Sequence, residues 1–506
     1  MYIQRLLPNL YRDSVSLMEL SASLGKLPGV EQASAVMATP GNLDFLRAAG
    51  LLDGKVAARP NDLLVAVRGK SNAALEAALA AALSALDKQP APLAAGGVAQ
   101  MPLRSLQMAL AQQSDANLAL ISVPGDYAAA EATKALRLGL NVMLFSDNVA
   151  LEDEIALKRY AKERNLLVMG PDCGTAIIDG VPLGFANAVR RGAVGIVGAS
   201  GTGTQQVSCL VHRLGAGVSH AIGTGGRDLH KDVGGISMLQ GLERLARDRD
   251  TKVIVLVSKP PAPGVAREVV QAARRAGKPV VLNFIGAPPE ATGDNLFVAR
   301  TLEDAANAAV ALSKGKKPSK KSEANPRPPL VRLKADQRYI RGLFSGGTFC
   351  YEASSLIGDA WSNAPVDKAR HLKDVWKSQA NTLIDLGDDE FTRGRPHPMI
   401  DQRLRNERLL AEAADPQVAV ILLDVVLGYG AHADPAAEIA PAIQKAQAAA
   451  RKKGRTIAFV ASVCGTDEDP QGLEKQEAAL REAGVLLEGS NARAARLAAA
   501  IAERRK

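Results

Sequence analysis

Short apolar runs alternate with amphipathic stretches along most of the chain, and this alternation predicts strands connected by helices. Residues 116–149 show a strand, a helix pattern and a second strand in succession. An amphipathic helix pattern over 151–165 follows, and then a further strand within 165–180 that ends in a turn. Strands separated by helices are typical of βαβ units, so the pattern predicts a mostly parallel sheet with right-handed crossovers.

The stretch 194–211 (VGIVGASGTGTQQVSCLV) joins an apolar strand to a helix pattern through a loop of small residues. The backbone N–H groups of such a loop, its hydroxyls and the helix N-terminus are suited to binding phosphate. No Gly-Lys-Ser/Thr follows, which excludes the lysine-bearing nucleotide loop. A plain strand-to-helix turn with a Ser/Thr cap fits this stretch equally well. The candidate phosphate-binding residues are Ser200, Gly201, Thr202 and Gly203.

A second copy of this pattern occupies residues 340–356 (IRGLFSGGTFCYEASSL) and adds the candidates Ser345, Gly346, Gly347 and Thr348. The segments that follow also correspond in pairs, namely 220–229 with 382–391, 248–262 with 415–430, and 273–289 with 450–466. So long an internal repeat predicts two like α/β domains. Each carries a glycine loop at the carboxyl end of its first strand, an arrangement that would allow both helix N-termini to point at one shared anion.

The N-terminal part has a pattern of its own. Residues 1–88 predict a small α/β unit with strands at 1–7, 30–39 and 62–69. Helices are predicted over 14–27, with Ser14 as the cap, and over 72–86. Thr39, before a short helix, is interpreted as a cap rather than a ligand contact. Residues 89–104 predict a Pro/Gly/Ala linker.

Charge and cysteine usage narrow the function classes. The net charge of +9 over 506 residues is concentrated in 314–338 and in the C-terminal ERRK, which indicates a solvated basic linker rather than a nucleic-acid-binding face. The basic balance favours small anionic substrates. The four cysteines and six histidines show no metal-ligand or disulfide spacing. We therefore predict no bound metal and a protein of a reducing compartment. Without a signal-peptide or membrane-span pattern, we expect a cytoplasmic protein with no membrane partner.

Further candidates lie in loops after predicted strands. Gly170-Pro171-Asp172-Cys173-Gly174-Thr175 follows one strand, and Asp172 and Cys173 are candidate ligand contacts, although a packed thiol also explains Cys173. Gly225, Gly226 and Arg227 follow the strand after the first glycine loop. A guanidinium beside two glycines is suited to holding a carboxylate or phosphate bidentately, so Arg227 is a candidate catalytic residue.

Residues 394–401 (GRPHPMID) contain two more candidate catalytic residues, Arg395 and His397. The flanking prolines make this segment stiff and lower the entropy of presenting its polar side chains. A lone histidine more often has a structural role, and both interpretations stay open.

The chain resembles the FdrA family, relatives of the succinyl-CoA synthetase (ADP-forming acyl-CoA ligase) superfamily, over nearly its whole length. The segments that carry the resemblance are FSDNVALEDEIALK, LLVMGPDCGTAI, GIVGASGTGTQQ, HAIGTGGRDL, VGGISML, VSKPPA, GRPHPMID and LLDVVLG. The resemblance implies an α/β fold with a Rossmann-like nucleotide-binding-type domain, then two flavodoxin-like parallel-sheet domains, besides the small N-terminal unit. The implied domains are 1–88, CoA-binding-like 105–190, first ligase-like 191–314, basic linker 315–337 and second ligase-like 338–506.

The chain also departs from the ligases. In those enzymes the helices after the two glycine loops point at a phosphohistidine, carried by a Gly-His-Ala-Gly-type loop after the strand that here reads PVVLNFIG. This chain continues APPEATGDNLF and has no histidine between His230 and His371. No stretch corresponds to the ATP-grasp domain of the ligases.

The resemblance implies a reaction of phosphate without nucleotide or phosphohistidine. The FdrA family is linked to oxamate carbamoyltransfer in ureide (allantoin) breakdown, in which oxalurate and phosphate give oxamate and carbamoyl phosphate, alongside separate partner subunits. Two alternatives stay open, an acyl-CoA synthetase subunit that binds CoA and a non-catalytic scaffold. We therefore expect an anionic substrate, phosphate or carbamoyl phosphate, and partner proteins in a hetero-oligomer.

Overall fold

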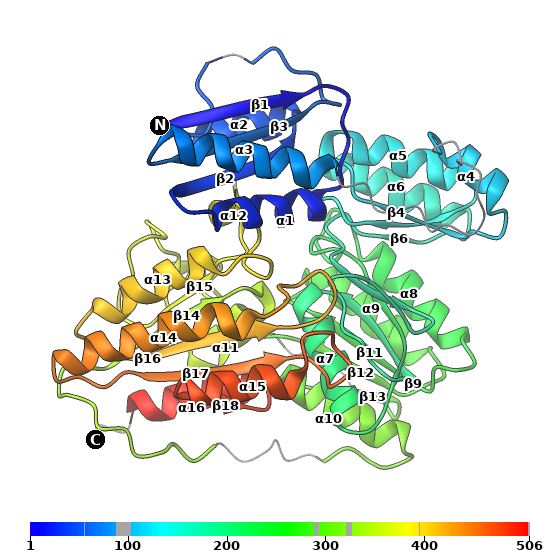
Figure 1. The fold of residues 1–506 in the computed structure, drawn as a ribbon. Helices are drawn as coiled ribbons and strands as arrows, with labels where there is room; N and C mark the ends of the chain where they lie inside the picture. The colour runs from blue at the N-terminus through cyan, green and yellow to red at the C-terminus, as the bar shows by residue number, and fades with distance from the viewer. Residues whose placement is uncertain (55, 88–102, 288–292, 320–325, 394, 504–506) are drawn as a thin grey trace. The chain divides into compact units, whose positions relative to one another are not determined.

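The fold was analysed in a computed structural model (Figure 1). It describes residues 1–54, 56–87, 103–287, 293–319, 326–393 and 395–503. Most of the predicted linker 89–104, part of the basic linker and the end of the basic tail lie outside the described residues. The chain divides into two compact units, one formed by 1–168 with 389–401 and the other by 169–388 with 402–506.

The first unit begins with an antiparallel three-stranded sheet in the order β1-β3-β2. Its elements are β1 (Tyr2–Leu7), α1 (Ser14–Gly25), β2 (Val30–Met37), α2 (Pro40–Ala48), β3 (Leu63–Gly69) and α3 (Asn72–Asp87). Alternate residues of β3 point to opposite faces, so Val65 packs with α1 and α3 while Leu64 packs with α2. The predicted α/β unit is therefore present, with a core on each face of its sheet.

The helix caps of this sheet test two sequence-based interpretations. Ser14 is not the cap of α1. The extended residue before the helix is Asp13, whose carboxylate accepts the Ser16 N–H at 3.0 Å. Thr39 does cap α2, because its hydroxyl oxygen accepts the Asn42 N–H at 3.3 Å.

The first unit continues with a small sheet in the order β4-β5-β6, whose first two strands are parallel. Its elements are α4 (Leu106–Gln112), β4 (Leu118–Ile121), α5 (Gly125–Arg137), β5 (Asn141–Leu144), α6 (Leu151–Glu163) and β6 (Val168–Met169). Buried alanines of α5, namely Ala128, Ala132 and Ala135, let this helix lie close to the sheet. A short helix, α12 (Asp389–Thr392), belongs to the segment that joins this unit from the second half of the chain.

The second unit contains two mainly parallel sheets, and the first has the order β13-β12-β11-β9-β10-β7-β8. Its elements are β7 (Thr175–Ile178), β8 (Val181–Gly184), β9 (Arg191–Ala199), α7 (Gly201–Arg213), β10 (Val218–Gly223), α8 (Ile236–Arg247), β11 (Val253–Ser258), α9 (Pro263–Arg274), β12 (Val280–Phe284), β13 (Leu296–Val298) and α10 (Leu302–Ser313). The strands β9 to β13 are parallel and follow the flavodoxin-like order 2-1-3-4-5. The antiparallel pair β7 and β8 extends this sheet, although both strands lie in the range 105–190 of the implied preceding domain.

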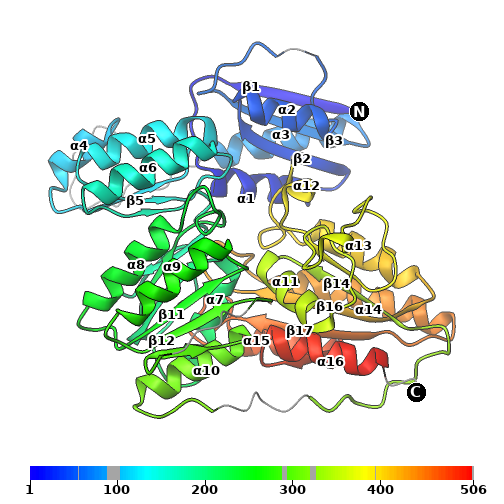
Figure 2. The ribbon, with the colours of Figure 1, turned by 180° about the vertical axis from the view of Figure 1, so that it is seen from behind.

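The second sheet repeats this topology in the order β15-β14-β16-β17-β18, and Figure 2 labels its strands β14, β16 and β17. Its elements are β14 (Tyr339–Phe344), α11 (Gly347–Ile357), η1 (Lys368–Arg370), β15 (Thr382–Asp385), α13 (Arg403–Ala414), β16 (Val418–Val426), α14 (Pro435–Lys452), β17 (Ala458–Cys464), α15 (Leu473–Glu482), β18 (Val485–Glu488) and α16 (Asn491–Glu503). Taken along the chain, these strands again give the order 2-1-3-4-5 with all pairs parallel. The internal repeat in the sequence is therefore a repeat of fold.

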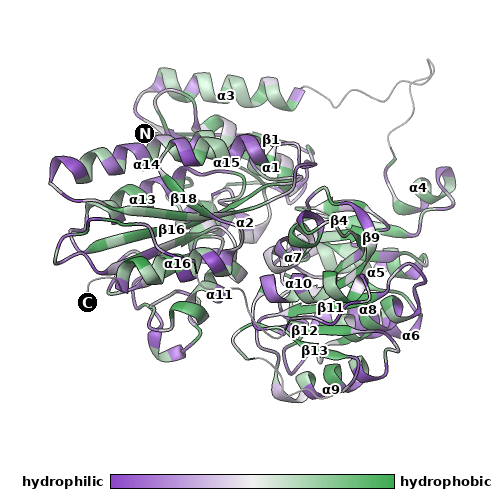
Figure 3. Cartoon of the chain, turned by 90° about the horizontal axis from the view of Figure 1, so that it is seen from below, coloured by the Kyte–Doolittle hydropathy of each residue, from purple (hydrophilic) through white to green (hydrophobic). Residues whose placement is uncertain are grey.

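The strands of both sheets are nearly continuous apolar runs, as buried parallel strands require. All six residues of β11 and all nine of β16 are buried. Figure 3 shows these strands as hydrophobic and the outer faces of the surrounding helices as more hydrophilic. Within the described residues, no helix combines the length and apolar character needed to cross a membrane.

Candidate functional site

The two glycine loops meet in the second unit. Ser200 is the N-cap of α7 and Thr348 lies in the first turn of α11, and their hydroxyl oxygens are 2.6 Å apart and buried. A Cβ at Gly346 would lie 2.8 Å from the methyl group of Thr202, so the two loops also pack against each other. The helix N-termini therefore share one location, as the internal repeat led us to expect. That an anion binds there stays a prediction.

The first glycine loop is shaped by its cap. The Ser200 hydroxyl oxygen accepts the Gly203 N–H at 3.0 Å, and a Cβ at Gly203 would collide with that hydroxyl. The N–H groups of Gly201 and Thr202 donate to no described residue, and Gly201 is exposed. These two amides are therefore the donors that the loop offers to an anion.

The second glycine loop already holds an internal anion. The Asp424 carboxylate, from β16, accepts the N–H groups of Ser345 and Gly346 at 2.8 Å each and the Ser345 hydroxyl at 2.9 Å. Arg405 of α13 donates to the same carboxylate at 2.8 Å, and both side chains are 1% exposed. The predicted phosphate donors Ser345 and Gly346 are thus occupied. The amides of Gly347 and Thr348 donate to no described residue and stay available.

Two further charged residues, Asp385 and Lys259, lie beside the second loop. Asp385 ends β15, and a Cβ at Gly347 would collide with its Oδ2 atom. Burial raises the pKa of Asp385 to about 6, the nearby charge of Lys259 opposes the shift, and Asp388 adds to it. Lys259 follows β11 of the first sheet, and its ammonium lies 5.7 Å from the ring centre of Tyr351 on α11. Lys259 thus reaches from one domain of the repeat to the other.

The predicted loops after β6 and β10 lie against the first glycine loop. Gly225 has a φ of +82° and packs against the carbonyl of Pro171, where no side chain fits. The Cys173 thiol is 2% exposed and donates to the carbonyls of Thr175 at 3.6 Å and Gly223 at 3.5 Å. Cys173 is therefore a packed thiol in this structure, and its role as a ligand contact stays a prediction. The nearest atom to a Cβ at Gly201 is the Thr175 hydroxyl, at 3.6 Å.

The remaining predicted site residues differ in exposure. Gly226 and Asp172 are exposed and face each other, since a Cβ at Gly226 would lie 3.7 Å from an Asp172 carboxylate oxygen. Arg227 is half-buried in the same loop. Arg395 is exposed, and the Nδ1 atom of half-buried His397 accepts the Met399 N–H at 3.1 Å. Arg395 and His397 fold with the first unit, and their participation in the site stays a prediction.

Sequence reasoning missed four charged residues of this site, Lys259, Asp385, Arg405 and Asp424. Three of them share a signal that was present in the sequence. Lys259 follows the apolar run of β11, Asp385 ends β15 and Asp424 lies near the end of β16. A charge at the carboxyl end of a buried parallel strand lies where such sheets bind ligands. Arg405 has no comparable signal, because it lies inside a helix.

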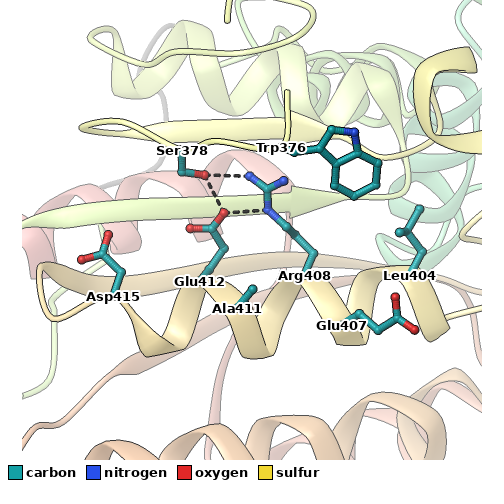
Figure 4. Close-up of a pocket in the computed structure, with 8 residues that line it drawn as sticks. All are labelled: Trp376, Ser378, Leu404, Glu407, Arg408, Ala411, Glu412 and Asp415. Atoms are coloured by element: carbon teal, nitrogen blue, oxygen red, sulfur yellow. Dashed lines mark hydrogen bonds and ion pairs between the residues drawn. The ribbon is translucent and has the colours of Figure 1, made fainter. Parts of the chain in front are cut away.

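A pocket of about 360 Å³ lies elsewhere on the second domain of the repeat (Figure 4). It is lined by Trp376, Ser378, Leu404, Glu407, Arg408, Ala411, Glu412 and Asp415. Glu412 accepts from Arg408 at 2.7 Å and from Arg341 at 2.7 Å, and Asp415 accepts from Arg341 at 2.8 Å. These buried charges satisfy one another, and the pocket shares no residue with the glycine loops.

Family models match three parts of the chain. The model described as CoA-ligase matches residues 343–501, which covers the second domain of the repeat. The model described as CoA binding domain matches residues 189–286, which contain the first glycine loop. The model described as AllF, heavy metal-associated domain, matches residues 1–101.

The residues present do not fit a soft-metal site in the N-terminal part. Residues 1–101 contain neither cysteine nor histidine, which are the ligands that such metals select. Across the parts of the chain that the structure describes, no group of three or more His, Cys, Asp or Glu residues is arranged to hold a metal.

Curated relatives support the same family. The chain is 46% identical over 497 residues to the uncharacterized protein YahF of Escherichia coli K12, covering 96% of this chain and 95% of that protein. It is 31% identical over 171 residues to a mitochondrial succinate–CoA ligase [ADP-forming] alpha subunit of Trichomonas vaginalis, covering 32% of this chain and 53% of that one. The chain thus spans about half the length of that ligase subunit.

Among solved structures, a dinucleotide-forming acetyl-coenzyme A synthetase of Ca. Korarchaeum cryptofilum matches with 18% identity and a TM-score of 0.33, covering 76% of this chain and 82% of that one. So low a TM-score carries no argument about function. The full-length likeness to YahF and the matched ligase and CoA-binding domains establish the family. The chain belongs to the succinyl-CoA synthetase-like family that includes YahF.

Proposed function

We propose that this chain is an FdrA-type subunit of a carbamoyltransferase. In the proposed reaction, an oxygen of phosphate attacks the carbamoyl carbon of oxalurate. The carbon–nitrogen bond to the oxamate part then breaks, giving oxamate and carbamoyl phosphate. The proposal includes separate partner subunits in a hetero-oligomer and a cytoplasmic location, which suits four buried free thiols.

The observation that supports the proposal is the meeting of two helix N-termini with unused amides. Gly201 and Thr202 of α7 and Gly347 and Thr348 of α11 offer N–H groups at one location. Amides at a helix N-terminus stabilise phosphate and the charge that develops on a tetrahedral intermediate. In this proposal Arg227 assists by binding a substrate anion, because its guanidinium lies in the adjacent loop.

This chain has no histidine at the position that corresponds to the phosphohistidine of the ligases, which supports direct transfer of the carbamoyl group to phosphate. The loop after β12 reaches α11, since a Cβ at Gly286 would lie 3.2 Å from the Tyr351 ring. In the ligases this loop carries the histidine, whereas residues 285–301 here contain none. Positioning and electrostatic stabilisation would then supply most of the rate, with no covalent enzyme intermediate.

Calorimetry of the full chain with phosphate and with carbamoyl phosphate tests the proposal. We expect binding of both, and loss of both in Gly201→Val, because the added side chain blocks the open amides. Gly41→Val is the matched control, since Gly41 lies in the first turn of α2 in open space. Absence of binding in the wild-type chain and in its mixture with partner subunits would contradict the proposal.

A second candidate function is that of an acyl-CoA ligase subunit. The matches to the CoA-binding and CoA-ligase models favour it. The same loop residues that hold phosphate would then hold the phosphate groups of CoA or of an acyl phosphate. CoA binding with a micromolar dissociation constant would support this function over the transferase. Absence of binding of phosphate, carbamoyl phosphate and CoA would support a non-catalytic scaffold.

A further inference from the structure

Two opposite charges flank the junction of the glycine loops without pairing with each other. Asp385 is 8% exposed and Lys259 is half-buried, and the charge of Lys259 lowers the pKa of Asp385 against the effect of burial. The Lys259 nitrogen nevertheless does not lie within 4.0 Å of a carboxylate oxygen of Asp385, so the two residues form no ion pair. Both side chains lie against the first two turns of α11, Asp385 at Gly347 and Lys259 at Tyr351, without direct contact between their charged atoms.

Each of the two groups has hydrogen-bonding capacity left over. The Oδ1 atom of Asp385 accepts the Gly387 N–H at 3.0 Å, whereas its Oδ2 atom accepts from no described residue. Oδ2 lies against Gly347, where α11 begins. The Lys259 ammonium likewise donates to no described residue and lies near the Tyr351 ring. The unused Oδ2 oxygen and the unused ammonium are therefore open to the donors and acceptors of a ligand.

We propose that Lys259 and Asp385 form a donor–acceptor pair that binds an amide or ureido group of the substrate, with Asp385 as a further catalytic residue. An amide presents a carbonyl oxygen and an N–H side by side. The ammonium donates to the oxygen and the carboxylate accepts from the N–H, so a group of this class fills the gap between the two charges. This inference rests on the proposed carbamoyl transfer and names the group that the site recognises.

Asp385 also supplies a proton route that balances the reaction. As the phosphate oxygen forms its bond to the carbamoyl carbon, its hydroxyl proton passes to the Oδ2 atom of Asp385. As the carbon–nitrogen bond breaks, the electron pair goes to the nitrogen and Asp385 returns the proton to it. The products are the amide and carbamoyl phosphate, and no net proton is released. Lys259 stabilises the negative charge on the carbonyl oxygen in between.

The charged groups around Asp385 come from several elements. Lys259 follows β11, Asp388 follows β15, Asp424 of β16 is paired with Arg405, and the buried Cys350 thiol belongs to α11. Because the pKa of Asp385 is about 6, this carboxyl exchanges protons close to neutrality. A carboxyl with an ordinary pKa of 3.8 would be a much weaker proton acceptor there.

Oxamate is the probe for the pair, because it contains the amide without the carbamoyl group. We expect the full chain to bind oxamate in calorimetry, and Lys259→Met and Asp385→Asn each to weaken it about tenfold or more. Phosphate binding should change less than about threefold. Lys252→Met is the matched control, since Lys252 is exposed at the opposite end of β11. The proposal would be overturned if the wild-type chain does not bind oxamate, or if both variants bind oxamate with the affinity of the wild type.

Turnover separates this inference from the function on which it rests. With partner subunits, Asp385→Asn should lower kcat about a hundredfold, raise the KM for the substrate about tenfold, and remove the limb of the kcat profile near pH 6. If the wild type forms no carbamoyl phosphate while oxamate binding still requires both residues, the carbamoyltransferase assignment fails and the amide site stands. If the wild type forms carbamoyl phosphate and both variants match it, the amide site fails and the transferase stands.

Discussion

The hydroxyl oxygens of Ser200 and Thr348 lie 2.6 Å apart, although 148 residues separate them in the chain. Each residue lies at the beginning of the first helix of its own flavodoxin-like domain. The hydrogen bond therefore fixes the separation of two helix N-termini whose partial positive charges repel each other. An anion between them would relieve this repulsion, which is why we expect the two glycine loops to bind one shared anion.

Replacement of Thr348 tests this hydrogen bond. Thr348→Val keeps the shape of the side chain and removes the hydroxyl. We expect the free energy of unfolding to fall by about 1 kcal/mol, and the affinity for phosphate to fall more than it does in the control variant. Denaturant unfolding and calorimetry measure the two effects. Ser219→Ala is the control, because the Ser219 hydroxyl makes a buried 2.7 Å bond to Thr251 away from the loops. Equal effects of the two variants on phosphate affinity would contradict the role of Thr348.

Alanine scanning of two loop glycines should give opposite results. A Cβ at Gly347 would collide with the Asp385 carboxylate, whereas the nearest atom to a Cβ at Gly201 is 3.6 Å away. Gly347→Ala should therefore destabilise the protein by about 1–3 kcal/mol, and Gly201→Ala should leave stability within about 0.5 kcal/mol. Thermal unfolding of both variants checks the prediction. A stable Gly347→Ala would mean that Asp385 is not held against this helix.

Removing the internal anion of the second loop should be costly. Asp424→Asn deprives the Ser345 and Gly346 amides of their charged acceptor and leaves Arg405 buried without a counter-ion. We expect a loss of about 3–5 kcal/mol in the free energy of unfolding. The control is Asp415→Asn, because Asp415 pairs with Arg341 but is 33% exposed at its side chain. Similar losses in the two variants would show that the second loop does not depend on Asp424.

The pH dependence of stability should carry the signature of Asp385. Its pKa is raised from 3.8 to about 6 in the folded chain, mainly by burial, so the native state binds this proton more tightly than the unfolded state. Stability from this group is therefore present at low pH and is lost as the pH rises from about 4 to about 6, by roughly 3 kcal/mol.

The measurement compares wild type with Asp385→Asn, because asparagine does not titrate and the other carboxylates cancel in the difference. The variant should gain stability relative to the wild type as the pH rises through this window. A difference that stays constant from about pH 4 to about pH 8 would place the Asp385 carboxylate in solvent.

Local sequence was sufficient to predict the main strands and helices around the two glycine loops. An apolar run such as β16, followed by a helix pattern, identifies a buried parallel strand because burial and helix periodicity leave their marks on neighbouring residues. The repeat also predicted two like domains, and the 2-1-3-4-5 order that the parallel strands of both sheets share confirms it. The cap of α1 was misassigned by one residue, since Asp13 and Ser14 are both common caps and only backbone conformation separates them.

The sequence by itself determined which segments form strands and which form helices. It also determined at which edge of the sheets a ligand is expected to bind. Only the tertiary structure decided which side chains meet there. Asp424 fills the amides that were assigned to phosphate, and Lys259 approaches Asp385 from the other domain of the repeat. Such contacts join residues more than 70 positions apart. The sequence around one strand end does not indicate which charged residue of another strand end will lie beside it. The chemistry of the junction is therefore set by packing, because only packing determines which charges share a buried space.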